Sequence, residues 1–124
     1  MIAKKNTQGE ILDLNLFDLG WLVGMIEGEG SVNSHINEKS GYLCTSLSIA
    51  STDKDIIDRL NSLFPGASRQ YKREYSNHYK TQYVWSINKR KDIRTISKTI
   101  FPHLSERRKT QFGKVINMIN EYEE

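Results

Sequence analysis

The sequence is poor in cysteine and proline, with one cysteine and two prolines in 124 residues. The single cysteine, Cys44, excludes an internal disulfide, and no Cys-X-X-Cys or Cys/His cluster offers a zinc site. No apolar run reaches the length that spans a membrane, and the first residues contain no apolar stretch long enough for a signal peptide. We therefore expect no membrane partner and no secretion signal. The expected location is the cytoplasm, or an organelle matrix or stroma if the gene is organellar.

A large charge imbalance, repeats and low-complexity segments are also missing. Lys and Arg number 18 and Asp and Glu number 15, a formal net charge of +3, which permits nucleic acid as a partner without requiring it. The length suits one domain with one core, so a two-part architecture must arise by association. We predict a single domain over residues 1–124, with residues 1–14 as an extended N-terminal arm.

Hydrophobic periodicity places regular elements in the first half of the chain. Residues 15–28 are predicted to be a helix, which Asn15 can cap and which carries Asp18 in its first turn. Residues 31–37 and 43–50 alternate between apolar and polar side chains, and a turn lies between them. These two runs predict an antiparallel hairpin.

The second half repeats this order with further helices. Residues 51–64 predict a helix, 67–75 and 79–88 a second pair of strands, and 91–101 and 105–121 two closing helices. The order is α-β-β-α-β-β-α(-α). It predicts an α+β fold with an antiparallel four-stranded sheet, whose one face is covered by helices while the other stays open to solvent or a ligand.

Three glycines, Gly20, Gly24 and Gly28, recur every fourth residue and form one stripe on the first helix. Each costs about 1 kcal/mol relative to alanine in a helix interior. The stripe fits the close approach of another helix, either from this chain's own core or from a partner. Glu27 and Glu29 follow at the helix end, where carboxylates meet the unfavourable end of the helix dipole. A compensating cation or metal is expected there.

The segment LVGMIEGEG at 22–30 resembles the nine-residue LAGLIDADG motif of homing endonucleases and their maturase relatives. Leu22, Gly24, Ile26 and Gly30 coincide with the motif, and glutamates replace its two aspartates. The order of elements over nearly the whole chain also matches the family. The chain contains one such motif, as do members of the homodimeric branch of the family. The resemblance also implies a saddle-shaped sheet.

The resemblance further implies that two motif helices pack side by side in a homodimer. Glu29 takes the position of the family's metal-binding acid, and the adjacent Gly28 is expected to contribute to the same metal site. Glu27 takes the position of the first motif acid, which supports the helix ends and the interface. The implied interface residues are Gly20, Trp21, Val23, Gly24, Glu27 and Gly28.

The activity that the resemblance implies is site-specific cleavage of double-stranded DNA. The expected target is long and pseudo-palindromic, the product is a staggered double-strand break with short 3′ overhangs, and the biological role is intron homing. Hard oxygen ligands suit Mg²⁺ or Mn²⁺, which activate water and stabilise charge on phosphate oxygens. Ca²⁺ is expected to bind without supporting cleavage, and no small-molecule cofactor is expected.

Two further catalytic positions follow from the resemblance. Asp53 falls where the family has a polar residue after the second strand, although Asp53 or Thr52 can instead simply cap the next helix. Arg108 falls in the basic stretch that the family has near the start of a late helix. Lys109 and Arg107 are the neighbouring candidates for the same position. The alternative is that this basic stretch is a solvated turn that binds nothing. The high pKa of an arginine favours charge stabilisation over proton transfer.

The open face of the sheet is the predicted surface for reading DNA. Amide, hydroxyl, imidazole and guanidinium groups form hydrogen bonds with base edges or bind phosphate. On the strand 67–75 either the arginines or Gln70 and Lys72 can face DNA, and we choose the arginines. The predicted DNA-binding residues are Ser31, Asn33, His35, Asn37, Ser46, Ser48, Arg69, Arg73, Lys80 and Gln82.

Two other classes of function remain open from the sequence. A LAGLIDADG-like domain can bind nucleic acid without cutting it, as an RNA maturase or a transcription regulator, although the acid at Glu29 argues against this. An α+β module that binds protein would explain the glycine stripe but not a polar strand face.

Overall fold

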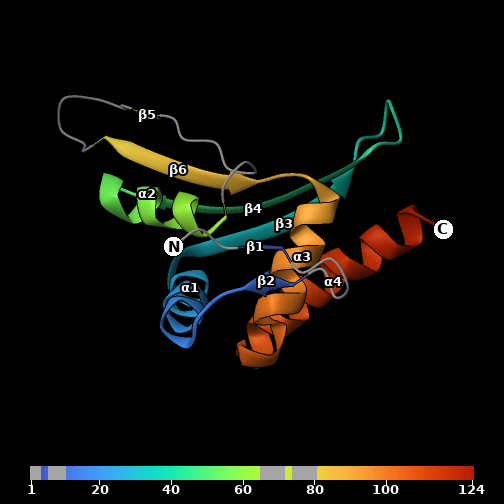
Figure 1. The fold of residues 1–124 in the computed structure, drawn as a ribbon. Helices are drawn as coiled ribbons and strands as arrows, with labels where there is room; N and C mark the ends of the chain where they lie inside the picture. The colour runs from blue at the N-terminus through green and yellow to red at the C-terminus, as the bar shows by residue number, and fades with distance from the viewer. Residues whose placement is uncertain (1–3, 6–10, 65–71, 74–80) are drawn as a thin grey trace.

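The computed structural model describes residues 4–5, 11–64, 72–73 and 81–124. Two of the predicted DNA-binding residues, Arg69 and Lys80, lie outside them. The elements of the main fold are α1 (Leu16–Glu29), β3 (Gly30–Ile36), β4 (Leu43–Ser51), α2 (Lys54–Leu63), β5 (Lys72–Arg73), β6 (Gln82–Ile87), α3 (Arg90–Ile100), a 3₁₀ turn η1 (Phe101–His103) and α4 (Glu106–Tyr122). This order confirms the predicted α+β fold class (Figure 1).

The four-stranded sheet has the order β3-β4-β6-β5, with every neighbouring pair antiparallel. The predicted hairpin of β3 and β4 forms, and β4 also pairs with β6, so two segments far apart in the sequence meet at the centre of the sheet. On β4, and on β6 from residue 84 to residue 87, the side chains alternate between buried and less buried positions. Such alternation is expected where one face of a sheet lies on the core.

The helices cover that buried face (Figure 1). Leu47 and Ile49 of β4 and Trp85 and Ile87 of β6 are fully buried there. They join one apolar cluster with helix residues that include Ile26 of α1. The helical contribution is Leu22, Ile26, Ile57, Leu60, Leu63, Ile93, Ile96, Ile100, Phe112, Val115 and Ile119. None of the helices in the described residues is long and apolar enough to cross a membrane.

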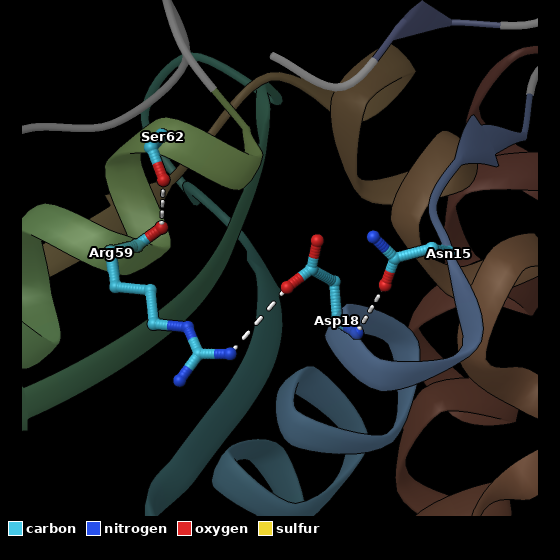
Figure 2. Close-up of polar contacts among 4 residues, drawn as sticks. All are labelled: Asn15, Asp18, Arg59 and Ser62. Atoms are coloured by element: carbon cyan, nitrogen blue, oxygen red, sulfur yellow. Dashed lines mark hydrogen bonds and ion pairs between the residues drawn. The ribbon is translucent and has the colours of Figure 1, made fainter. Parts of the chain in front are cut away.

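Helix α1 begins as the sequence predicts. Asn15 adopts an extended backbone at the N-cap, and its side-chain oxygen accepts a hydrogen bond of 2.8 Å from the Asp18 N–H (Figure 2). Arg59 of α2 reaches across to the Asp18 carboxylate at 3.5 Å and lies over the Trp21 ring at 4.1 Å. These contacts join α2 to the first turns of α1.

Helix α2 starts later than the predicted range 51–64. Strand β4 continues through Ser51, which pairs with Tyr83 of β6, and Asp53 takes the N-cap position. The Ser51 hydroxyl accepts a hydrogen bond of 3.0 Å from the Asp53 N–H. Serine, threonine and aspartate favour positions before a helix over its interior, so the helix begins after them, at Lys54.

The turn end of the β3–β4 hairpin contacts α3 and α4. The guanidinium of Arg90 lies over the rings of Tyr42, at 5.5 Å, and Tyr122, at 4.6 Å. Glu123 forms ion pairs with Arg90 and Arg94. The end of α4 and the start of α3 thus hold the hairpin in position.

The predicted N-terminal arm contains two short strands, β1 (Lys4–Lys5) and β2 (Leu12–Asp13), which pair antiparallel. The sequence patterns did not indicate this pairing. The Leu12 N–H donates a hydrogen bond of 2.8 Å to the Thr99 hydroxyl of α3, and the Leu12 side chain is buried. This contact attaches the segment before α1 to α3.

We expect the substitution Asn15→Ala to lower the free energy of unfolding by about 1 kcal/mol, because it removes the acceptor for a backbone N–H at the start of α1. Urea unfolding monitored by circular dichroism measures the change. Asn120→Ala, at an exposed position of α4, is the control and should cost far less. Equal effects of the two substitutions would contradict the capping role of Asn15.

Candidate functional site

The solvent-facing side of the sheet is called the outer face here. Cross-strand register places on it Ser31, Asn33, His35, Cys44, Ser46, Ser48, Ala50, Gln82, Val84 and Ser86. All of these side chains are exposed or half-buried, and none carries a carboxylate or an ammonium group. The predicted orientation of β3 and β4 is therefore confirmed, and so is that of Gln82. Arg73 pairs with Gln82, so its register position also belongs to the outer face.

Asn37 stands apart from the other predicted DNA-binding residues. It follows β3, and its side-chain oxygen accepts hydrogen bonds from the N–H groups of Lys39, at 3.0 Å, and Ser40, at 3.1 Å. Gly41 closes the same turn with a φ of 72°, which glycine adopts without strain. The Asn37 oxygen thus shapes the turn, and its role in reading DNA stays a prediction.

The glycine stripe of α1 faces away from the core of this subunit. A Cβ atom added at Gly20, Gly24 or Gly28 would meet no heavy atom within 4 Å among the described residues. The alternative that the stripe packs against the chain's own sheet or helices is therefore wrong. Leu16 and Phe17, at the start of the same helix, are 86% and 75% exposed. Large apolar side chains beside an open stripe of glycines form a surface suited to another helix.

The other predicted interface residues have partners inside the subunit. Trp21 and Val23 are half-buried and pack against the edge of the core, and Arg59 covers the Trp21 ring. Glu27 points to the start of α4, where its carboxylate accepts hydrogen bonds from the Ser105 N–H at 2.5 Å and the Ser105 hydroxyl at 2.9 Å. Glu27 therefore secures α1 to α4.

Hydrogen bonding lowers the pKa of Glu27 below its usual value. The largest cause is the bond from the Ser105 backbone N–H, and the Ser105 hydroxyl and the positive charges of Arg108 and Arg107 act in the same direction. Partial desolvation acts in the opposite direction but does not outweigh them. The carboxylate is thus held in its ionised form.

Arg108 belongs to the same junction. It is 7% exposed, and its guanidinium donates hydrogen bonds to the Glu27 carbonyl at 3.1 Å and to the Gln111 side chain at 3.0 Å. The first bond satisfies one of the carbonyls that a helix leaves unpaired at its end. The alternative of a solvated turn is therefore wrong for Arg108, whereas a catalytic role for it stays a prediction. Arg107 is exposed, and Lys109 lies 5.9 Å from the Phe101 ring.

Glu29 ends α1 beside a cavity of about 410 Å³. The cavity also contains Asp53, whose side chain makes no capping hydrogen bond. Two exposed carboxylates from distant parts of the sequence thus border one space. Its full lining is Met25, Glu29, Ala50, Ser51, Thr52, Asp53, Ile56 and Gln82.

These oxygen donors are the chemistry that hard divalent ions prefer. Magnesium usually keeps several waters, so one or two carboxylates suit it better than a complete protein cage. No group of three His, Cys, Asp or Glu residues that could hold a metal occurs in the part of the chain that the structure describes. Gly28, which precedes Glu29, lies in the last turn of α1.

Sequence reasoning missed Ser105, which secures Glu27, and Ser51, which borders the cavity. Ser105 caps α4 with its hydroxyl, which accepts from the Arg108 N–H at 3.3 Å. A serine just before a helical run is a recognisable capping signal. Nothing in the local sequence, however, indicates that the same serine also binds a carboxylate 78 residues earlier.

We expect Glu27→Gln to destabilise the protein near neutral pH, because the ionised carboxylate accepts two hydrogen bonds near two arginines. Since the folded pKa is lowered, this stability is present above the ordinary glutamate pKa of about 4.3 and is lost as pH falls through the folded value. Urea unfolding at a series of pH values should show the difference from wild type shrinking toward low pH. A difference that is constant with pH, or one matched by the control Glu121→Gln, would contradict this role.

Comparison with known proteins identifies the fold. The sequence model of the LAGLIDADG-like domain matches residues 16–100. Among solved structures, the LAGLIDADG homing endonuclease I-GzeII in complex with its DNA target superposes with a TM-score of 0.67 at 16% sequence identity. The match covers 90% of this chain and 38% of that one. No protein with a curated description matches significantly. Because the family model covers most of the chain and includes the motif helix and the sheet, this protein belongs to the LAGLIDADG-like domain family.

Proposed function

We propose that this protein is a homing endonuclease that binds double-stranded DNA on its outer face and cuts it as a homodimer with divalent metal ions. The observation that carries the proposal is the position of Glu29. It lies at the exposed end of the helix whose glycine stripe is open, and beside the polar outer face. A dimer formed along that helix brings two such acids together.

The chemistry of the outer face supports DNA as the ligand. Its hydroxyl, amide and imidazole groups can donate to or accept from base edges, and the absence of carboxylates on its described residues avoids repulsion of phosphates. Two-stranded antiparallel ribbons fit the major groove. The similar endonuclease I-GzeII was solved with a DNA target. Arg73 is at a register position on the same face and is proposed to contact DNA as well.

The partner in the dimer is proposed to contact the open side of α1. At the three glycines an added Cβ atom would meet no heavy atom of the described residues within 4 Å, so the backbones of two helices can approach closely. The exposed Leu16 and Phe17 extend the apolar surface. A two-fold axis along this contact makes the two subunits equivalent. The proposed DNA target is therefore pseudo-palindromic.

In cleavage, Glu29 is proposed to hold Mg²⁺ or Mn²⁺, with Asp53 as the other carboxylate bordering the cavity. Such an ion stabilises the charge that develops on the phosphate and activates water. Arg108 fixes the helix end that carries Glu29, and Lys109 and Arg107 are the more exposed basic residues for binding phosphate. The proposed product is a staggered break at an intron-insertion site.

Glu29→Gln should bind a duplex that the wild-type protein selects from a random library with nearly unchanged affinity. It should lose cleavage, because the amide keeps the shape of the side chain but removes the charge that holds the metal. Binding is measured by fluorescence anisotropy and cleavage by gel electrophoresis with Mg²⁺. The control Glu38→Gln, in the exposed hairpin turn, should cut normally. Cleavage that survives Glu29→Gln would remove Glu29 from catalysis. A wild-type protein that binds but never cuts would favour the non-cleaving alternative, an RNA maturase or transcription regulator.

Gly24→Leu should abolish the dimer while leaving the subunit folded, because the described part of one subunit leaves the space around Gly24 open and the proposed partner helix fills it. Sedimentation velocity at micromolar concentration reports the mass, and circular dichroism reports the fold. Gly113→Leu is the matched control, since Gly113 is also a helical glycine with open space around it but lies on α4. A wild-type monomer with and without DNA, or a Gly24→Leu dimer, would contradict the proposed interface.

A further inference from the structure

One pair on the outer face differs from its neighbours. Ala50 of β4 lies directly opposite Val84 of β6. Ala50 is exposed and Val84 is half-buried, so both side chains remain open to a ligand. Among the described outer-face pairs this one alone consists of two aliphatic side chains, whereas the others carry a hydroxyl, amide, imidazole or thiol group.

The position of the pair relates it to the proposed catalytic end. Ala50 lines the same cavity as Glu29 and Gln82. On the other side of the pair, Ser48 and Ser86 lie opposite each other, and Ser31 extends that row onto β3. The aliphatic pair therefore lies in the row next to the three serines and borders, through Ala50, the cavity that contains Glu29.

Structural roles inside the subunit do not account for both residues. Valine is common in strands because of its branched side chain, but alanine is depleted there. Neither residue belongs to the apolar cluster on the covered face of the sheet. Their exposed aliphatic surface is thus left for a ligand.

In the major groove, thymine is the base that presents an apolar group, its C5-methyl, and small aliphatic side chains contact it. We propose that Ala50 and Val84 contact the methyl group of a thymine close to the cleaved phosphate, and that they select for thymine at this position of each half-site. This inference rests on the proposed function, because it names a feature of the DNA that the same face would bind. Serine hydroxyls in the neighbouring row can pair with either donors or acceptors and so discriminate less.

The test begins with selection of bound duplexes from a random library by the full-length wild-type protein in Ca²⁺. The selected sites should share a thymine in each half-site. Replacing that thymine by uracil removes only the methyl group, and should weaken binding about fourfold, the factor expected for one buried methyl group. Uracil at other selected thymines is the internal comparison.

Two variants connect the methyl group to the aliphatic pair. Val84→Ser removes both methyl groups of the valine side chain, and Ala50→Ser adds a hydroxyl to the other member at an exposed position. In both, the preference for thymine over uracil should shrink. Ser86→Ala, on the same strand and the same face, should keep the full preference. Circular dichroism melting verifies that each variant is folded.

The outcomes separate this inference from the proposed function. The inference is overturned, and DNA binding left intact, if tightly bound sites share no thymine or if uracil substitution does not weaken binding. It is also overturned if both variants keep the full preference for thymine over uracil. Failure to bind any duplex overturns the proposed function and the inference together.

Discussion

The site depends on how the end of α1 is fixed to the start of α4. Ser105 donates two hydrogen bonds to the Glu27 carboxylate, and the buried Arg108 donates one to the Glu27 carbonyl. The Arg108 bond satisfies a carbonyl that the end of a helix leaves unpaired, and it places positive charge where the helix dipole is negative. As a result the last turn is held rigidly. Glu29, two residues later, can then remain exposed beside the cavity without a partner helix to orient it.

The same helix divides its surface between two tasks. Leu22 and Ile26 are buried in the core, while Gly20, Gly24 and Gly28 lie on the exposed side. The core residues and the junction with α4 stabilise the helix, which offsets the cost of three glycines in a helix interior. A helix fixed on one side can present bare backbone on the other. The two motif acids are separated in the same way, since Glu27 is bound within the subunit and Glu29 is not buried.

The sheet is built on a similar division. Apolar side chains of β4 and β6 fill the covered face, which leaves the alternate positions free of packing demands. Serine, asparagine and histidine can occupy these positions at little cost in stability. Arg90, whose guanidinium lies over the rings of Tyr42 and Tyr122, holds the turn end of the β3–β4 hairpin against α3 and α4. The outer face is therefore a preformed surface, which reduces the ordering cost of binding a ligand.

The sequence by itself determined most of the main elements and the identity of the motif, because periodicity and capping are local. Asn15 begins α1, and alternation assigned Ser46 and Ser48 to the outer face. Local patterns also left β4 too short and did not indicate that Arg108 is buried. Only the tertiary structure decided that Glu27 binds Ser105, that Glu29 and Asp53 share a cavity, and that Ala50 faces Val84. Each of these depends on the packing or register of segments far apart in the chain, which no local pattern of residues specifies.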